Sequence, residues 1–286
     1  MSSPSGLVDI KEKIWNGTVN LIVKFQVRKD VKEFLITAYR NSYFPVYYPV
    51  LIAYFLRFQK DLKFKPVWLE FEEVPLKWNI SIGVLYDHLY LPSIIDAKRE
   101  KPWTLSLKYG EPYPSQTIIP FHHLHLNFTI DYEKSLKQVL MNQLKQSCFV
   151  LNGNSKAVLK LSEEDTNKLF DSIKRHNLKD FEDINKKMAS INRHIQRIPT
   201  KIYYSGTTIM TQAPLCAVDE NNDPTTLRNI LEQYLSSFMD DTGASFSVYC
   251  HGIDIEPLLD EHLVTTWELF RNLDNFLYIV VLLKTS

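Results

Sequence analysis

The chain has 286 residues, of which 45% are hydrophobic and 23% charged; this suits two or three globular domains and argues against general disorder. Its 33 Lys and Arg residues balance its 33 Asp and Glu residues, so it lacks a basic excess and we expect no nucleic acid among its partners. The three cysteines, Cys148, Cys216 and Cys250, lie far apart, which favours a reducing compartment over a disulfide framework or a zinc ribbon.

The apolar stretches are short. Residues 41–56 form the most apolar stretch without a charge, but they are too few to cross a bilayer and include Pro45 and Pro49. Residues 276–283 are typical of a buried strand. The first fifteen residues lack the apolar core of a secretory signal. We expect a soluble protein, so its membrane contact is expected to be peripheral.

The first part of the chain begins with a short amphipathic helix over residues 7–15, which Asn16-Gly17 ends. Strand, strand, helix, strand, short helix and strand then follow one another. We expect the strands over residues 18–27, 33–44, 67–74 and 102–110, the first helix over residues 50–62 with Pro49 at its start, and the short helix within residues 75–90. This order is typical of the β-grasp, or ubiquitin-like, fold, in which one helix packs across a small mixed sheet.

A proline-containing linker precedes a change in character. Residues 131–195 have helical periodicity and are rich in charged and amide side chains. Asn152-Gly153 predicts the end of a first helix that begins near residue 131. Ser162 with Asp165 predicts a capping box at the start of a second helix. Residues 181–195 continue the helical pattern.

The first pattern returns after Pro199. We expect strands over residues 201–206, 207–212, 245–255 and 275–283, a helix over residues 225–239 capped by Thr225, and a helical segment over residues 256–272. The prediction is an α+β protein with two ubiquitin-like (β-grasp) domains flanking a helix-rich domain, and a short N-terminal helix. The expected boundaries are residues 1–15 for the N-terminal helix, 16–112 for the first ubiquitin-like domain, 113–130 for the linker, 131–195 for the helix-rich domain and 196–286 for the second ubiquitin-like domain.

Two histidines offer weak metal-binding chemistry. His123 and His125 fall on the same side of a strand if this segment is one, because side chains alternate along a strand. A single strand supplies at most two of the usual four ligands, and no carboxylate or thiol has suitable spacing. Polar histidines on an edge strand are therefore the preferred interpretation, and we predict no metal site. Phosphate-cradling and dinucleotide motifs are absent, so no cofactor is predicted.

The cysteines do not form a convincing catalytic pair. Cys250 and His251 are adjacent, but neighbouring residues of a regular strand point to opposite faces. A buried structural thiol is the preferred interpretation for Cys250 and for Cys148, while Cys216 falls in a loop-like stretch. We predict no catalytic residue.

Lys145 raises a question that helix geometry leaves open. Leu136, Leu140 and Leu144 form one apolar stripe, and Lys145 lies about 140° from its centre, so its amine should reach solvent. That orientation suits a nucleophile that attacks an activated carbonyl, but it equally describes an ordinary surface lysine. The terminal sequence "VVLLKTS" lacks the flexible glycine of a ubiquitin-like donor, so in a conjugation reaction this chain would be the acceptor.

Four segments resemble the autophagy protein 5 family, and especially its yeast members. "QLKQSCFVLNGNSKAVLKLS" resembles the family's lysine-bearing segment, and "IWNGTVNLIV" resembles the start of its first strand. "PLKWNISIGVLYD" resembles its Ile-Gly-Leu-Phe-Asp stretch, with Tyr86 in place of the usual Phe. "HGIDIEPLLDEHLVTTWELFRNLDNFLYIVV" resembles its C-terminal domain. The resemblance runs from about residue 7 to residue 284.

The resemblance implies a cytoplasmic, non-catalytic protein that accepts autophagy protein 12 through an isopeptide bond at Lys145. Autophagy proteins 7 and 10 perform this conjugation, and autophagy protein 16 binds the conjugate without a covalent bond. The assembly then acts as a ligase-like scaffold: it stimulates transfer of autophagy protein 8 from its carrier, autophagy protein 3, to phosphatidylethanolamine on the preautophagosomal (phagophore) membrane.

The resemblance also suggests where autophagy protein 16 binds. Its amphipathic helix needs an apolar groove with charged rims. Ile82 and Gly83 are candidates for close approach, and Asp87 for pairing with a basic residue of that helix. Alternatively, Gly83 serves only a turn and Asp87 is solvated.

Other interpretations remain open from the sequence. One is an unconjugated ubiquitin-like interaction module of another pathway. Another is a thiol-dependent conjugating enzyme. The lipid-contacting residues are also open, since Lys156, Lys160, Lys174 and Arg175 are merely near one another in the sequence.

Overall fold

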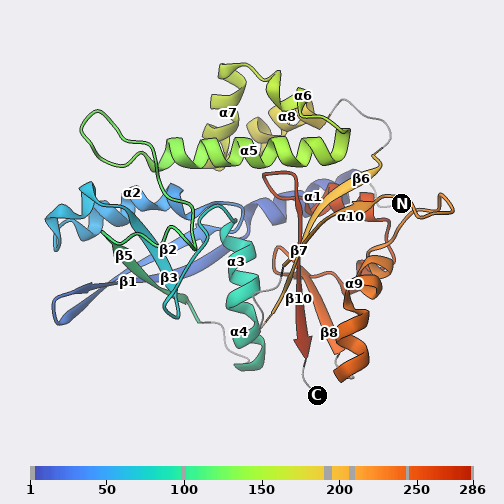
Figure 1. Ribbon diagram of the computed structural model, residues 1–286, viewed down its shortest axis with the longest axis horizontal. Helices are drawn as coiled ribbons and strands as arrows, with labels where there is room; N and C mark the ends of the chain where they lie inside the picture. Colours follow the sequence, from blue (N-terminus) through green and yellow to red (C-terminus); the bar gives the residue numbers. More distant parts are fainter. Residues whose placement is uncertain (1–3, 98–100, 190–194, 206–209, 243–244, 285–286) are drawn as a thin grey trace.

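The computed structural model describes residues 4–97, 101–189, 195–205, 210–242 and 245–284. Two five-stranded sheets lie side by side, and a group of helices covers one side of both, with α5 running across them (Figure 1). The fold is therefore α+β, with two ubiquitin-like units and a helical region, as the sequence predicts.

The first ubiquitin-like domain follows the N-terminal helix. That helix is α1 (Pro4–Asn16). The elements of the domain are β1 (Thr18–Val27), β2 (Asp30–Tyr39), α2 (Phe44–Phe55), a 3-10 helix η1 (Lys60–Phe64), β3 (Val67–Phe71), β4 (Val74–Pro75), α3 (Ile82–Leu89), α4 (Leu91–Ala97) and β5 (Trp103–Tyr109). The strand order is β2-β1-β5-β3-β4, in which β1 pairs antiparallel with β2 and parallel with β5.

Alternation along β1 explains how the first core forms. Val19, Leu21, Val23 and Phe25 point to the same face of the sheet and are all buried, while their neighbours are more exposed. Phe55 of α2 packs against Phe25, with ring centroids 5.0 Å apart. The helix therefore buries the apolar face of the sheet, and the removal of this surface from water stabilises the domain.

The second ubiquitin-like domain repeats the arrangement. Its elements are β6 (Arg197–Tyr204), β7 (Met210–Cys216), α9 (Leu227–Thr242), β8 (Ser245–Cys250), β9 (Ile253–Asp254), a 3-10 helix η2 (Glu256–Leu258), α10 (Leu263–Phe270) and β10 (Leu277–Lys284). The strand order is β7-β6-β10-β8-β9, with β6 antiparallel to β7 and parallel to β10. Each strand thus has a counterpart in the first sheet, although the two halves share no clear sequence repeat.

The helical region lies between these domains in the sequence. Its helices are α5 (Tyr132–Asn152), α6 (Lys156–Leu159), α7 (Glu163–Lys174) and α8 (Leu178–Ala189). The predicted stripe of Leu136, Leu140 and Leu144 is buried in a core that these helices share with Trp15 and Trp78. The bundle is therefore packed onto the first domain.

Helix ends follow the predicted signals in two places. Gly153 adopts the left-handed conformation, with φ 68°, and ends α5. Ser162 accepts a hydrogen bond from the backbone N–H of Asp165 at 3.0 Å and caps α7. At α9 the prediction is wrong by one residue, because the hydroxyl of Thr226, and not that of Thr225, accepts from the N–H of Asn229 at 3.3 Å.

Three predictions in the first domain are wrong. The strand expected over residues 33–44 is β2, which begins at Asp30 and ends at Tyr39. α2 begins at Phe44 and not at Pro49, because Pro45 occupies the first turn, where its missing N–H is not needed, and Pro49 lies inside the helix. The expected strand over residues 67–74 is a hairpin, because Glu72 and Glu73 have φ values of 48° and 65° and reverse the chain between β3 and β4.

Some predicted positions fall outside the described residues. These are residues 1–3 of the predicted N-terminal segment, residues 190–194 at the end of the helical region, residue 206 at the end of one predicted strand and residues 207–209 at the start of the next. Within the part of the chain that the structure describes, no helix combines the length and apolar character needed to cross a bilayer.

Candidate functional site

Lys145 lies two turns before the end of α5, a helix of 21 residues that is capped at both ends. Asp131 accepts a hydrogen bond from the Lys134 N–H at 2.8 Å at the start, and Gly153 forms the end. The residue is half-buried, which is less exposure than helix geometry alone predicted. Among the described residues, none forms a hydrogen bond or an ion pair with its amine.

A polar cleft borders the same part of α5. Its volume is about 470 Å³, and Asn142, Gln143 and Gln146 line it from the helix. Trp78 and Asn79 contribute from the first domain; Lys201 and Gln212 contribute from the second. The neighbours of Lys145 along the helix thus present amide side chains to an open cleft, and amides can bond an extended peptide backbone.

Lys201, which lines this cleft, belongs to a buried chain of hydrogen bonds. Its amine donates to the Tyr278 hydroxyl at 3.1 Å, and that hydroxyl donates to Oδ2 of Asp274 at 2.6 Å. Burial lowers the pKa of Lys201, and the Asp274 carboxylate opposes part of this change. The amine of Lys201 is therefore occupied by an internal partner.

Ile82 and Gly83 begin α3, and both are buried. The Gly83 N–H donates to the Arg40 carbonyl at 2.9 Å. A Cβ atom at Gly83 would lie 2.9 Å from the Arg40 Cβ and 3.1 Å from its carbonyl oxygen. The close approach that the sequence suggested for Gly83 therefore exists, but its neighbour is Arg40 of the same chain.

Asp87 also contacts Arg40. Its side chain is 1% exposed, and its carboxylate forms an ion pair with the guanidinium. Burial raises the pKa of the Asp87 carboxyl, while Arg40 and the backbone of Gly252 oppose part of that rise. Neither a solvated Asp87 nor a carboxylate presented to a partner fits this geometry, because a fully buried charge is satisfied from within the chain. No sequence pattern pointed to Arg40, whose partners come from distant segments.

A second cleft, of about 170 Å³, meets all three regions of the chain. Ile14 and Trp15 line it from α1, Phe181 from α8 and Leu269 from α10, and Leu273 lies beyond α10. Charged side chains also line it: Lys11, Glu182, Lys186, Glu268 and Arg271. This combination matches the apolar groove with charged rims that the amphipathic helix of autophagy protein 16 was expected to need. None of the residues that line this cleft was among the binding residues predicted from the sequence.

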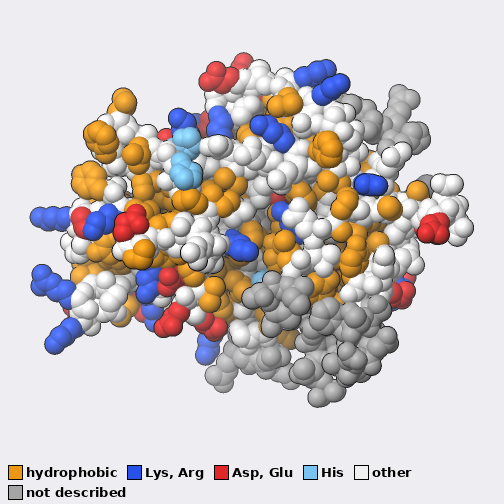
Figure 2. Space-filling model, in the orientation of Figure 1, with side chains coloured by type: hydrophobic (Ala, Val, Ile, Leu, Met, Phe, Trp, Pro, Cys, Tyr) orange, Lys and Arg blue, Asp and Glu red, His pale blue; other side chains and the backbone are white. Residues whose placement is uncertain are grey.

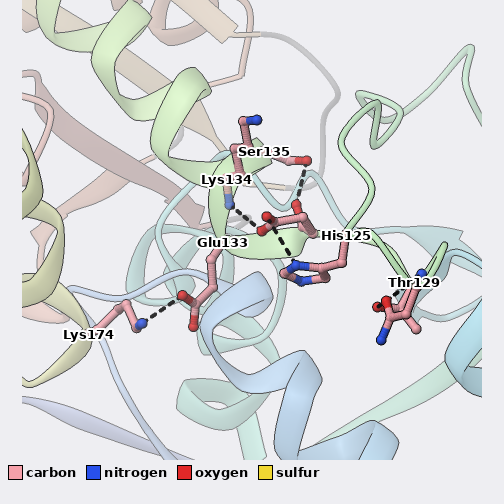
Figure 3. A network of polar contacts seen from close by, with 8 residues as sticks. His125, Thr129, Glu133, Lys134, Ser135 and Lys174 are labelled. Atoms are coloured by element: carbon pink, nitrogen blue, oxygen red, sulfur yellow. Dashed lines mark hydrogen bonds and ion pairs between the residues drawn. The ribbon is translucent and has the colours of Figure 1, made fainter.

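The histidines do not lie on a strand as the preferred interpretation required. His123 and His125 belong to the loop before α5, where the Leu124–Ile130 bridge is isolated from both sheets. Nε2 of His123 contacts Oε1 of Gln138. Nδ1 of His125 lies 3.6 Å from Oδ2 of Asp131 (Figure 3). Within the described ranges, no three His, Cys, Asp or Glu side chains come together in a group that could hold a metal ion.

Cys250 and His251 make separate internal contacts. The Cys250 thiol donates to the Tyr278 carbonyl at 2.9 Å, and burial raises its pKa well above the ordinary value. Nε2 of His251 pairs with the Phe270 carbonyl at 2.8 Å, and burial lowers the pKa of His251 to about 4. Cys148 is buried as predicted, whereas Cys216 is exposed at the end of β7 and not in a loop. Cys250 is thus a neutral buried thiol, which is a poor nucleophile.

The fold and these sites define a class: proteins with two ubiquitin-like domains around a helical bundle, carrying an unpaired lysine on the bundle's longest helix. Models of one family match all three parts of the chain. "Autophagy protein ATG5, UblA domain" matches residues 14–109, "alpha-helical bundle region" matches residues 133–190, and "UblB domain" matches residues 197–281.

Whole-chain comparisons agree with the family models. Autophagy protein 5 of Debaryomyces hansenii is 46% identical and covers all of this chain and 99% of its own length. The Candida albicans protein of that name is 43% identical over 99% of this chain and all of its own. The crystal structure of Kluyveromyces marxianus Atg5 superposes with a TM-score of 0.76 at 25% identity, over 96% of this chain and 99% of that one. The chain belongs to the autophagy protein 5 family, as a fungal member, and its role lies in autophagy.

Proposed function

We propose that this protein accepts autophagy protein 12 at Lys145. The neutral amine attacks the thioester carbonyl that joins the C-terminal glycine of autophagy protein 12 to a cysteine of autophagy protein 10. A C–N isopeptide bond forms, the C–S bond breaks, the thiolate of the carrier leaves, and the amine loses a proton. Autophagy protein 7 supplies the activated donor. The lysine needs no catalytic partner in this chain, because the carrier holds the reactive bond.

One observation carries this proposal. The amine of Lys145 has no partner among the described residues, and it lies on a capped helix beside an open polar cleft. Lys168 and Lys174 of the bundle are paired, with Asp180 at 3.0 Å and Glu133 at 2.6 Å. Among the described residues, however, Lys134 of α5 has a free amine like Lys145, so the resemblance of the segment around Lys145 selects between the two. A free amine on a rigid helix can be positioned by a carrier without first breaking an ion pair.

The cleft offers a path for the incoming tail. Asn142 lies three residues before Lys145 and Gln146 directly after it, and both line the cleft. Their amides can donate to and accept from the backbone of an extended glycine-ended peptide. Replacing Asn142 and Gln146 by Ala is expected to slow conjugation while leaving the fold intact.

The test is a reconstituted conjugation with autophagy proteins 7, 10 and 12, followed on a reducing, denaturing gel. Wild type is expected to give a heavier band that survives reducing agent, and Lys145→Arg to abolish it. Lys134→Arg and Lys137→Arg are matched controls on the same helix and should keep the band. A band that persists in Lys145→Arg would move the acceptor elsewhere.

We also propose that autophagy protein 16 docks as an amphipathic helix on the cleft that meets all three regions. The apolar lining of Trp15, Phe181 and Leu269 suits a few anchoring side chains of such a helix. Glu182 and Glu268 provide carboxylates that can pair with a basic residue of the partner. From the sequence, Asp87 was the candidate for this pairing. Glu182→Lys with Glu268→Lys should weaken binding in calorimetry, whereas Asp260→Lys, at an exposed pair that does not line this cleft, should not.

In this proposal the conjugate with autophagy protein 16 is a non-catalytic, ligase-like scaffold. It stimulates transfer of autophagy protein 8 from autophagy protein 3 to phosphatidylethanolamine. The protein is cytoplasmic and binds the preautophagosomal membrane peripherally. Family membership favours this proposal over an unconjugated module of another pathway, and the buried, neutral thiol of Cys250 disfavours a thiol-dependent enzyme that uses this cysteine.

A further inference from the structure

The loop between β5 and α5 exposes large apolar side chains at its tip. Leu126 is 103% exposed and Phe128 is 77% exposed, and Leu124 before them is 57% exposed. Isolated exposed apolar residues are ordinary on protein surfaces, but here they gather on one turn. Apolar side chains project at the upper left of the molecule, where this loop extends from the start of α5 (Figures 1 and 2).

Local hydrogen bonds fix the conformation of this turn. Oδ1 of Asn127 accepts from the N–H of Thr129 at 3.1 Å and from its hydroxyl at 2.6 Å. The His125 N–H donates to the Thr129 carbonyl at 2.8 Å, and the Phe128 N–H donates to the His125 carbonyl at 2.9 Å. Phe128 has φ 62°, a left-handed conformation that a bulky residue rarely adopts. The turn is thus ordered by its own contacts while its apolar side chains stay in water.

Both ends of the loop are anchored in the fold. Phe121 stacks on Trp78, with ring centroids 4.7 Å apart, and Ile130 packs against the core of the first domain. At the far end, Asp131 lies near His125 and caps α5, so the loop and the helix share one polar network (Figure 3). The exposed tip therefore projects from a rigid base.

The loop contains no permanently charged side chain. From residue 112 to residue 130 the sequence has no Asp, Glu, Lys or Arg. Desolvation of a fixed charge would oppose moving the tip out of water. Because this loop carries no fixed charge, that cost does not arise.

A basic and aromatic strip lies at the base of the loop. Tyr132, the first residue of α5, accepts from the Val67 N–H at 3.1 Å and donates to the Lys65 carbonyl at 3.4 Å, which joins the segment directly after η1 to this end of α5. Lys60, Lys63 and Phe64 of η1 are exposed. Asp61 in the same segment is neutralised by Lys65 at 2.7 Å.

The strip continues onto the end of α2. Phe58 is exposed, and cations lie over its ring: the Arg57 guanidinium carbon and the Lys32 Nζ are each 5.6 Å from its centroid. The Lys63 amine lies 4.6 Å from the centroid of Phe64 in the same way. Cations and exposed aromatic rings therefore alternate along one end of the first domain.

We propose that these residues form a surface that binds bilayers containing anionic lipid, with the apolar tip inserted. This membrane face consists of Arg57, Phe58, Lys60, Lys63, Phe64, Leu126 and Phe128. The inference rests on the peripheral membrane contact in the proposed function and assigns residues to it. A protein partner fits less well, because lysine is depleted at protein–protein interfaces, whereas apolar groups beside Lys and Arg are typical of binding at an anionic membrane surface.

The membrane face lies near the start of α5, whereas the acceptor lysine lies further along the same helix. Lys145 follows Tyr132 by 13 residues on α5, and 1.5 Å per residue gives about 20 Å along the helix axis. A partner joined to Lys145 would then be held near the bilayer without lying in it. This distance suits a scaffold that delivers a protein to a lipid head group.

The test is co-sedimentation of the full chain with vesicles of phosphatidylcholine alone or mixed with phosphatidylserine. Wild type should prefer the anionic vesicles and lose affinity as salt rises. Lys60→Glu with Lys63→Glu should weaken that binding by at least roughly 25-fold, since each basic residue near an anionic surface contributes roughly fivefold. Leu126→Ser with Phe128→Ser should reduce binding to the same vesicles, with the salt dependence retained.

Lys77→Glu with Lys179→Glu is the matched control, since it reverses two exposed lysines outside the membrane face. Lys156→Glu with Lys160→Glu tests the rival site, because the sequence left these two exposed lysines open as lipid contacts. Binding equal to wild type in both membrane-face variants, loss confined to the control or to the rival site, or no binding by wild type would each overturn the proposal. The Lys145 gel assay separates this result from the proposed function. Membrane-face variants should still give the conjugate band, so loss of vesicle binding with an intact band assigns the defect to this surface.

Discussion

Replacing Asp87 by Ala should strongly destabilise the fold. The carboxylate is 1% exposed and its partner Arg40 has a side chain only 11% exposed, so the substitution leaves a buried guanidinium without its counter-charge. The guanidinium of Arg40 remains held by other contacts, because it also donates to the Gly83 carbonyl at 3.4 Å and lies 5.3 Å from the Tyr86 ring. It therefore cannot simply swing into solvent.

The expected loss is about 3–5 kcal/mol, the usual cost of removing one partner of a buried ion pair. That is a large share of the 5–15 kcal/mol that typically separates folded from unfolded domains. The double variant Arg40→Met with Asp87→Leu should be more stable than Asp87→Ala, because it removes both charges and leaves none uncompensated.

Chemical denaturation followed by circular dichroism measures this effect through the shift in the unfolding midpoint. Asp260→Ala is the control: it breaks the exposed pair with Arg228, so little change is expected. A loss in the free energy of unfolding below ~1 kcal/mol for Asp87→Ala, the scale of an exposed pair, would show that the buried ion pair does not stabilise the fold as expected. If that variant instead keeps its stability but loses autophagy protein 16, Asp87 is a partner-binding residue after all.

Three further substitutions test separate parts of the structure. Burial lowers the pKa of His251 to about 4, below the unfolded value near 6.5. The stability that is present above pH 6.5 should therefore be lost as the pH falls toward 4, by about 3 kcal/mol in all. His251→Asn, in which Asn tolerates the φ of 52°, should flatten this pH dependence in denaturation curves measured at several pH values. Ser162→Ala removes the cap of α7 and should cost about 1 kcal/mol in chemical denaturation; no shift in the midpoint would refute the cap. Gly153→Ala should cost about 1 kcal/mol by the same measurement, from backbone strain alone, because an added Cβ would meet nothing within 4 Å; a loss above about 3 kcal/mol would indicate a steric clash.

Local sequence patterns were reliable where the signal itself is local. β1 has the predicted bounds, 18–27, because alternation along ten residues shows directly which side chains face the core. Gly153 and Ser162 mark helix ends through their own backbone and side-chain chemistry. The proline at 49 misled, because Pro45 offered an equally good start one turn earlier, and only packing against the sheet decides between them.

For the candidate sites too, local sequence patterns predicted some features and tertiary packing decided the others. Periodicity placed Lys145 on a helix away from the buried stripe, but it could not say that the residue is half-buried or that a polar cleft adjoins it. Ile82, Gly83 and Asp87 were candidates for partner contact, whereas Gly83 and Asp87 contact Arg40 and the Ile82 N–H donates to the Ser42 carbonyl. No pattern within a segment can show such a neighbour, because the two are brought together by the packing of α3 against the end of β2.

The sequence alone therefore determined the repeated β-grasp order, the helical insertion and the family, since each depends on the order and periodicity of side chains along the chain. Tertiary structure alone decided which charges are buried, which clefts join the three regions and where apolar groups stay exposed. The physical reason is that burial and charge pairing depend on distances across the fold. The ion pair between Asp87 and Arg40 exists only because separate segments of the chain meet in the fold. The same holds for the proposed surface that combines the loop tip with the basic strip of η1.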